Sequence, residues 1–366
     1  MTRLWLAQIL AVIRLEVKKT FFAKRGLWIY LLALMPLALF VGHAIVKGYQ
    51  DRDRVRQAQH NEKSLRDQDL AAITRGMSDE EVVRRLGRPW MSHSWDEQVR
   101  NAEGSSGLVR HESYRYTDGA NDLYLRLEDG KVTWVMMGQS ENLGENSIVF
   151  AGVFQFFYLR LAIFFGCLGI FMNLFRGELL DKSLHFYFLA PIRRDVLMVA
   201  KYLAGLLAAT IIFMTSEGLQ FIALCWSLDS NVVTAYLYHG HGFAHAGAYL
   251  GITALACVGY GSLFLAAGLW VRNPIIPAAV ILIWEALNPF LPSVLQKISV
   301  IYYLKSLCPV EIPASPDTPA IFAMLISNPE PIAAPVAIFG VIVVSLAILF
   351  VSSRRVRRME INYTAE

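Results

Sequence analysis

The chain has 366 residues, of which 55% are hydrophobic and only 17% are charged, and its formal net charge at pH 7 is +4. A soluble domain carries roughly 25% charged residues, and the deficit here falls in stretches of about 20 residues that are almost free of charge. The composition therefore excludes an ordinary soluble protein and predicts an all-α polytopic membrane protein. The four cysteines form no CxxC pair or disulfide framework and are interpreted as small hydrophobic side chains.

The N-terminal residues 1–25 are predicted to form a basic amphipathic helix that lies in the cytoplasmic interface of the membrane. Apolar residues recur there at helical spacing, and most basic residues fall elsewhere on the helical wheel. Because Arg14, Lys18 and Lys19 follow the apolar residues and no small-x-small cleavage site precedes them, a cleaved signal peptide is rejected. The first span is expected over residues 26–46.

Residues 47–146 are polar and rich in Arg, Asp, Glu and Gln, and the segment is too long for a simple connection. A charged helical stalk is expected first, followed by a small α+β domain. Ser78 and Glu81 have the spacing of a capping box, so a helix is predicted over residues 79–86, and Gly87 would end it.

The same segment contains a strong signal for a β-hairpin. Two runs with strand character flank the step Asp129-Gly130, which favours a tight turn. Strands are predicted over residues 112–116, 123–127 and 132–136. The aromatic residues of these strands are expected to divide between a small core and an outer face that could bind a partner protein or a lipid.

Five more spans are predicted after this domain. The second covers residues 147–174, a charged segment covers residues 175–195, and the remaining four lie within residues 196–351, with a basic tail at 352–366. The four are expected near residues 196–226, 246–271, 275–290 and 333–351. Basic residues then collect on one side of the membrane, which places both termini in the cytoplasm and residues 47–146 outside.

The charged segment 175–195 carries Arg, Lys, Asp and Glu between two apolar spans, so it is expected to be a cytoplasmic excursion. Its residues and the six spans resemble the type-2 ABC-transporter permeases, the membrane subunits of many exporters. The matching residues are Phe175-Arg176-Gly177-Glu178, Ser183-Leu184 and Leu189-Ala190-Pro191-Ile192-Arg193-Arg194. The last run corresponds to the family's step into the third span.

This resemblance implies a six-helix type-2 permease fold that pairs with a second permease chain, identical or paralogous. It also implies a cytoplasmic ATPase subunit that grips a coupling segment. The residues expected at that contact are Glu178, Leu184, Phe188, Leu189, Pro191, Ile192, Arg193 and Arg194. Membrane lipids are the other expected partners, and no nucleic acid is expected. Many relatives have a short loop between the first two spans, and the inserted domain departs from that pattern.

The inserted domain resembles the small domain of SmpA/OmlA-type outer-membrane lipoproteins. The matching residues are Ile73-Thr74-Arg75-Gly76-Met77-Ser78, Glu81-Val82, Leu86-Gly87-Arg88-Pro89 and Leu127-Glu128-Asp129-Gly130-Lys131-Val132. The resemblance implies a periplasmic partner and the inner membrane of a diderm bacterium.

The sequence contains no G-x-x-x-x-G-K-[ST] phosphate-binding loop. We therefore expect ATP to bind a separate subunit, with no enzyme activity and no cofactor in this chain. The alternative is a membrane-anchored assembly or sensor scaffold whose outer domain does the work. A secondary transporter is disfavoured because the two halves show no inverted repeat. The substrate stays open among lipids, glycans, peptides, drugs and ions.

Three charged residues lie inside predicted spans, where charge is costly and marks functional candidates. Arg160 and Glu285 are expected near mid-depth, where they could form an ion pair, and Glu217 is expected toward the outer end of the third span. They either fix helix packing or line a path for a polar group. His239, His241 and His245 are weak candidates for a metal site in an outer loop, and no metal is predicted.

Overall fold

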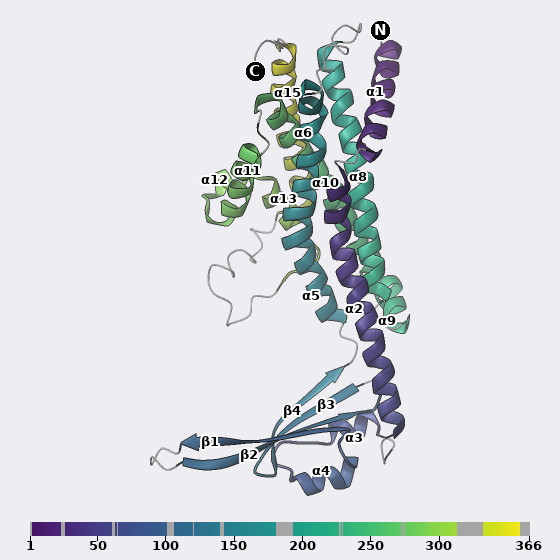
Figure 1. Ribbon diagram of the computed structural model, residues 1–366, viewed down its shortest axis with the longest axis vertical. Coiled ribbons are helices and arrows are strands. Elements are labelled where there is room, and N and C mark those ends of the chain that lie inside the picture. Colours follow the sequence, from purple (N-terminus) through teal and green to yellow (C-terminus); the bar gives the residue numbers. More distant parts are fainter. Residues whose placement is uncertain are drawn as a thin grey trace. The chain divides into compact units, whose positions relative to one another are not determined.

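A computed structural model gives the fold. It describes residues 2–22, 26–60, 63, 65–100, 106–119, 121–139, 143–180, 193–226, 228, 230–271, 273, 275–312 and 332–358. Within these residues, five helices are long and apolar enough to cross a membrane. The protein is therefore a multi-pass helical membrane protein with a small antiparallel sheet (Figure 1).

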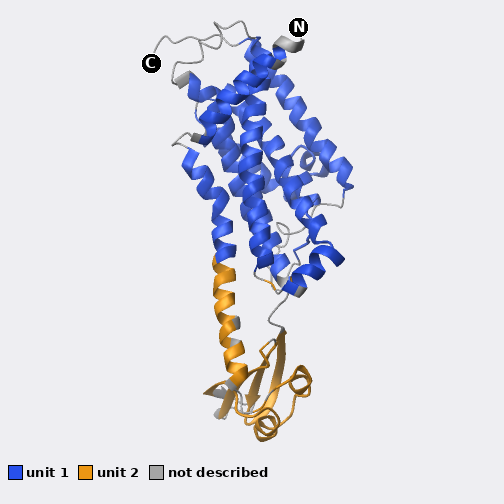
Figure 2. Ribbon diagram, turned by 90° about the vertical axis from the view of Figure 1, so that its right-hand side faces the viewer, with its two compact units in different colours: residues 1–41, 144–226, 230–366 blue, residues 42–143, 227–229 orange. Residues whose placement is uncertain are grey.

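The chain divides into two compact units, coloured separately in Figure 2. Unit 1 comprises residues 1–41, 144–226 and 230–366, and unit 2 comprises residues 42–143 and 227–229. The sequence-predicted domain at 47–146 therefore matches unit 2 closely. Each unit has its own hydrophobic core.

Unit 1 is helical throughout the described residues. Its elements are α1 (Thr2–Phe22), the first part of α2 (Leu27–His60), α5 (Leu143–Gly152), the π-helix η2 (Val153–Ile163), α6 (Phe164–Leu180), α8 (Arg194–Trp226), α9 (Ser230–Thr234), the π-helix η3 (Ala235–His239), α10 (Gly242–Trp270), α11 (Ile275–Leu287), the 3₁₀ helix η4 (Asn288–Phe290), α12 (Ser293–Gln296), α13 (Val300–Ser306) and α15 (Ala334–Arg357).

Five of the six predicted spans correspond to long apolar helices, whose bounds are Leu27–Gln59, Asn146–Glu178, Arg194–Trp226, Gly242–Trp270 and Ala334–Arg357. The predicted fifth span corresponds to an apolar helix with the expected bounds, Ile275–Phe290, which is shorter than the other five. Its α-helical part α11 ends at Leu287, because Pro289 and Pro292 follow and remove backbone donors that a longer helix needs. The chain continues through the short helices α12 and α13.

Helices α6, α8 and α10 pack around an aromatic core. The ring of Phe164 contacts the rings of Tyr260 and Phe264 edge-on, with centroids 5.4 and 4.9 Å apart. Gly261 of α10 makes room for the buried Phe171 of α6, since a Cβ added at Gly261 would lie 2.5 Å from the Phe171 ring. Small residues thus let large rings fill the space between the helices.

Helix α1 is more than an interfacial helix. Its Val12 is buried against Leu197 and Ala200 of α8, and the carboxyl-bearing Glu16 one turn later is also buried. Leu10 and Leu15 are exposed on the other side of the helix. The predicted amphipathic helix is therefore present, with one face packed on α8.

Unit 2 contains α3 (Asp67–Ala71) and α4 (Asp79–Leu86) and a four-stranded antiparallel sheet in the order β1-β2-β3-β4. The strands are β1 (Met91–Arg100), β2 (Ser106–Thr117), β3 (Asn121–Glu128) and β4 (Lys131–Gln139). Buried Leu123, Leu125 and Leu127 of β3 share a core with Val82 and Leu86 of α4.

The predicted helix over residues 79–86 and the predicted hairpin at Asp129-Gly130 are confirmed. The Ser78 side chain accepts a hydrogen bond from the backbone amide of Glu81 at the start of α4, and Gly87 ends that helix with φ 84°. Asp129 and Gly130 both have positive φ, which is the geometry of a tight hairpin turn between β3 and β4. Strand β1 was not predicted, because its residues are mainly polar and carry no alternating pattern.

Candidate functional site

One end of unit 1 brings together the residues that flank the predicted coupling segment. Figure 1 shows the end of α6, the start of α8, the end of α15 and helix α1 at this end. Residues 181–192 join α6 to α8 and lie outside the described residues, and with them Leu184, Phe188, Leu189, Pro191 and Ile192. Glu178, Arg193 and Arg194 are described, so the site is built from them upward.

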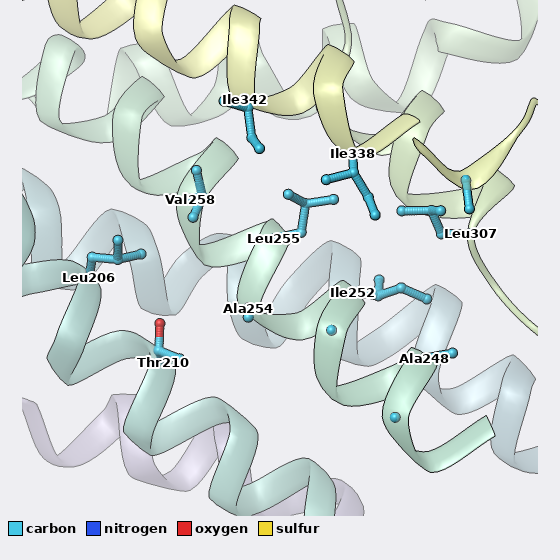
Figure 3. Close-up of a pocket in the computed structure, with 13 residues that line it drawn as sticks. Leu206, Thr210, Ala248, Ile252, Ala254, Leu255, Val258, Leu307, Ile338 and Ile342 are labelled. Atoms are coloured by element: carbon cyan, nitrogen blue, oxygen red, sulfur yellow. The ribbon is translucent and has the colours of Figure 1, made fainter. Parts of the chain in front are cut away.

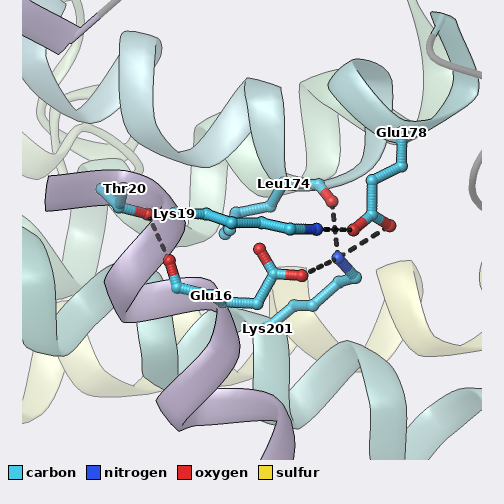
Figure 4. A network of polar contacts seen from close by, with 6 residues as sticks. All are labelled: Glu16, Lys19, Thr20, Leu174, Glu178 and Lys201. Atoms are coloured by element: carbon cyan, nitrogen blue, oxygen red, sulfur yellow. Dashed lines mark hydrogen bonds and ion pairs between the residues drawn. The ribbon is translucent and has the colours of Figure 1, made fainter. Parts of the chain in front are cut away.

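Glu178 belongs to a network of four charged residues, of which Lys19 alone is exposed and which we call the Lys201 network: Glu16, Lys19, Glu178 and Lys201. The ammonium of Lys201 lies 2.6 Å from Glu16 Oε1 and 2.8 Å from Glu178 Oε2. It also donates to the carbonyl oxygen of Leu174 at 2.9 Å. Lys19 Nζ lies 3.3 Å from the second oxygen of Glu178 (Figure 4).

The network is electrically balanced, with two carboxylates and two ammonium groups. The Lys201 side chain is fully buried, and its ammonium donates to Glu16 Oε1 and to the Leu174 carbonyl oxygen while forming an ion pair with Glu178. Burial by itself raises the pKa of Glu16, but the contact with the Lys201 ammonium outweighs it and leaves the pKa lowered. The charges therefore hold one another in place, which burial in an apolar setting requires.

The Lys201 network joins three elements. Glu16 and Lys19 come from α1, Glu178 from the end of α6, and Lys201 from the second turn of α8. Residues 181–192 connect α6 to α8 along the chain. The ion pairs of the network therefore join the helices on both sides of this connection to α1.

The two arginines that follow the connection make contacts of their own. Arg193 pairs with Asp195 at 3.0 Å, and its guanidinium lies 5.2 Å from the centre of the Trp5 ring of α1. Arg357 at the end of α15 also pairs with Asp195 at 3.0 Å, and Arg194 donates to the Arg357 carbonyl oxygen. The start of α8 is therefore tied to α1 and to α15.

Arg160 and Glu285 interact electrostatically, although among the described residues no direct ion pair joins them. The Glu285 carboxylate accepts hydrogen bonds from the Ser299 hydroxyl at 2.6 Å and from the backbone amides of Val300 and Ile301 at 3.1 and 2.9 Å. It caps the start of α13, where helix amides have no internal partner and a negative charge is favoured. The Arg160 guanidinium lies over the Phe156 ring, 5.4 Å from its centre.

Glu217 of α8 is 1% exposed. In the part of the chain that the structure describes, neither of its carboxyl oxygens has a hydrogen-bond partner. Among the described residues, Glu217 therefore shares no hydrogen bond with Arg160 or Glu285, which interact with each other electrostatically.

The histidine loop also differs from a metal site. His245 Nδ1 is hydrogen-bonded to the Tyr236 hydroxyl at 2.8 Å, and its ring lies 6.2 Å from that of His241. Burial raises the pKa of Tyr236 to about 12, so its hydroxyl stays protonated. Among the described residues, no group of three or more His, Cys, Asp or Glu side chains is placed to hold a metal ion.

An apolar pocket of about 630 Å³ lies between α8, α10 and α15 (Figure 3). Leu206 and Thr210 line it from α8, and Ile338 and Ile342 line it from α15. The small residues Gly247, Ala248, Gly251 and Ala254 line it from α10. Such a lining suits a hydrocarbon chain, the material that surrounds any spanning helix.

In unit 2, one face of the sheet carries exposed aromatic and methionine side chains. Trp134 and Met136 of β4 are 42% and 48% exposed, and they pair across the ladder with Arg126 and Tyr124 of β3. These positions alternate with the leucines of β3 that form the core. Exposed apolar faces of this kind often mark interaction sites.

Sequence reasoning missed Glu16 and Lys201, the centre of the ion network. Lys201 lay within the third predicted span and carried the same signal as Arg160, a charge inside an apolar run. Glu16 was taken as part of a basic segment, although it follows the apolar Val12 at helical spacing.

No family model, characterised protein or solved structure matches this chain.

Proposed function

We propose that this protein is the membrane subunit of an ATP-driven exporter of the type-2 ABC class, and that a separate ATPase docks on residues 175–195. The observation that carries the proposal is the Lys201 network. It fixes the helices on both sides of that segment to α1 through a fully buried lysine. A docking partner that moves the segment would therefore move α1, α6 and α8 together.

A plain membrane turn has no need for such an arrangement. Burying the three charges of Glu16, Glu178 and Lys201 costs several kcal/mol per ion unless each is paired, and a turn at the surface leaves its charges in water. This free-energy cost is expected where residues 175–195 must transmit the movement of a docked partner to α6 and α8. The apolar pocket between α8, α10 and α15 supports a substrate with a hydrocarbon part, since its lining carries one hydroxyl, that of Thr210.

The second candidate function is a membrane-anchored scaffold, and the exposed face around Trp134 and Met136 favours it. In that case a periplasmic protein binds unit 2 and the helices serve as an anchor. Both functions are compatible with one chain, but only the exporter requires an ATPase on the opposite side of the membrane.

The experiment that separates them is affinity purification of the tagged full-length chain from gently solubilised membranes. ATPase activity and co-purifying proteins are measured for wild type, for the double variant L189D/I192D and for W134D. The exporter predicts a P-loop ATPase that L189D/I192D loses and W134D keeps. A bound periplasmic protein lost only in W134D, with no ATPase in any eluate, would replace the exporter by the scaffold.

A further inference from the structure

Four buried polar residues on η2, α8 and α10 carry atoms that have no hydrogen-bond partner among the described residues. These atoms are both carboxyl oxygens of Glu217, Gln155 Oε1 of η2 and the hydroxyl oxygens of Tyr249 and Thr253 of α10. All four residues are buried, and none of these atoms forms a hydrogen bond within the described residues. We call the four residues the Glu217 cluster.

Several contacts bring the members of the cluster to one place. The Tyr249 ring packs on the ring of Phe154, the residue before Gln155, with centroids 4.7 Å apart. Gln155 Nε2 donates to the carbonyl oxygen of Val310 at 3.4 Å. Glu217 interacts electrostatically with Tyr249. Thr253 follows Tyr249 by one helical turn on the same face of α10.

The backbone of η2 shapes this region. Tyr158 of η2 donates to the carbonyl oxygen of Phe213 at 2.6 Å, one turn before Glu217 in α8. This bond holds η2 and α8 together beside the carboxyl group. A π-helical turn holds more residues than an α-helical turn, and such turns are frequent at functional sites.

The charge around Glu217 is unbalanced. The titratable groups that interact with it are Tyr158 of η2, Tyr249 of α10 and Cys308 after α13, and all three are ordinarily neutral near pH 7. No described lysine or arginine forms an ion pair with Glu217. A buried carboxylate without a counter-charge is costly, so the ionised group requires one positive charge from elsewhere.

We propose that the Glu217 cluster is an internal binding site for one monovalent cationic group, which exchanges with the proton of the Glu217 carboxyl. The carboxylate supplies one negative charge, and the amide and hydroxyl oxygens of Gln155, Tyr249 and Thr253 supply neutral ligands. A single positive charge neutralises this set, whereas a divalent ion would leave an excess. In the exchange, the carboxylic acid releases its proton to water as the cation binds, so charge is conserved.

Oxygen ligands of this kind suit either a hard inorganic cation such as sodium or a protonated amine. The shared chemistry is the single positive charge. The inference does not depend on an ATPase partner, and it holds for either candidate function.

The test uses the full-length chain in lipid nanodiscs and the hydrophobic reagent dicyclohexylcarbodiimide, which reacts with protonated buried carboxyl groups. Labelling is located by peptide mass spectrometry near neutral pH, and it is repeated with sodium chloride, with hexylammonium chloride and with N-methylglucamine chloride as an ionic-strength control. We expect labelling at Glu217, abolished in Glu217→Gln, and protection by sodium or by hexylammonium but not by the bulky control. Which cation protects distinguishes an inorganic ion from an amine.

Two conservative variants separate binding from structure. Tyr249→Phe and Thr253→Val each remove one unpartnered hydroxyl, which costs the fold little. We expect each to raise the cation concentration that gives half-protection by about tenfold, the effect of losing one hydrogen-bond-scale interaction, while labelling without cation is unchanged. The cation should also raise the melting temperature of wild type and not that of Glu217→Gln.

Two results would overturn the proposal. If Glu217 is labelled but no cation protects it, the carboxyl is only a protonated structural group. If Glu217 is not labelled and no cation shifts the melting temperature of wild type, the cluster binds no cation.

Discussion

The Lys201 side chain of α8 contacts both α1 and α6. Its removal would leave the carboxylates of Glu16 and Glu178 close together with only the half-exposed Lys19 as a counter-charge. We expect Lys201→Met to lower the free energy of unfolding by about 3–5 kcal/mol, the usual cost of breaking a buried ion pair from one side. Thermal or denaturant unfolding of the purified chain measures the effect.

Lys19 is the matched control for this prediction. It binds the same carboxylate, but its side chain is 53% exposed, so water screens the interaction. Lys19→Met should therefore cost no more than about 1 kcal/mol. Equal losses in the two variants would contradict the central role of Lys201.

The lowered pKa of Glu16 predicts that the stability of the fold depends on pH. Because its pKa is lower in the folded protein than the usual 4.5, the pairing with Lys201 stabilises the fold above that value and loses its contribution as the pH falls below it. We expect the stability difference between wild type and Glu16→Gln to be full near neutral pH and to shrink below about pH 4.5. Parallel melting curves at several pH values measure it, and a difference that stays constant would rule out the assignment.

At the scale of single residues, the sequence identified charged side chains inside the apolar spans but could not predict their interaction partners. Arg160 and Glu285 were matched by equal depth, and they do interact electrostatically. The hydrogen-bond partners of Glu285, the amides that begin α13, could not be predicted from depth, because they come from a separate short helix that follows α11. Lys201 and Glu16 are 185 positions apart, a separation no local pattern spans.

At the scale of elements, the cap of α13 can be tested directly. Glu285→Ala would leave the Ser299 hydroxyl and the amides of Val300 and Ile301 without their acceptor in a buried place. We expect a loss of roughly 3 kcal/mol in unfolding free energy, and a smaller loss for Glu285→Gln, which keeps one acceptor oxygen. Ile283→Ala, on the exposed side of the same helix, is the control and should change stability little.

The packing of α10 on α6 gives a second prediction at this scale. The Phe171 ring is fully buried and cannot move away from a methyl group at position 261. Gly261→Ala should therefore destabilise the protein by about 1–3 kcal/mol. Gly251→Ala on the same helix meets nothing within 4 Å, and it should leave stability unchanged or raise it by up to about 1 kcal/mol. Denaturation of both variants in the same detergent decides the comparison.

The elements themselves were largely predictable, because long apolar runs, a cap at Ser78 and the Asp129-Gly130 turn are local signals. The exceptions have local causes as well. The helix predicted near residues 275–290 has these bounds but is shorter than the other spans, since prolines follow Leu287. Strand β1 is held by its ladder with β2, so its own residues carry little signal.

At the scale of the whole molecule, unit 2 has the properties of an independent domain. Its core is made by its own helices and strands, including the fully buried Leu127. We expect a fragment of residues 65–139 to fold alone and to unfold in urea in one cooperative step. Leu127→Ala should lower its stability by about 2–5 kcal/mol, while Trp134→Ala on the exposed face should cost much less. A fragment without a cooperative transition would show that unit 2 depends on unit 1.

The direction in which Glu178 points depends on the exact number of residues that precede it in α6. If one residue between Phe164 and Glu178 were deleted, everything after the deletion would turn by roughly 100° about the helix axis, because each residue of an α-helix contributes that rotation. Glu178 would then face away from Lys201 without any change in its own codon. A single-codon deletion in this part of α6 would thus break the ion network as surely as replacing the lysine. In the π-helix η2, by contrast, a return to α-helical hydrogen bonding would absorb the loss of a residue.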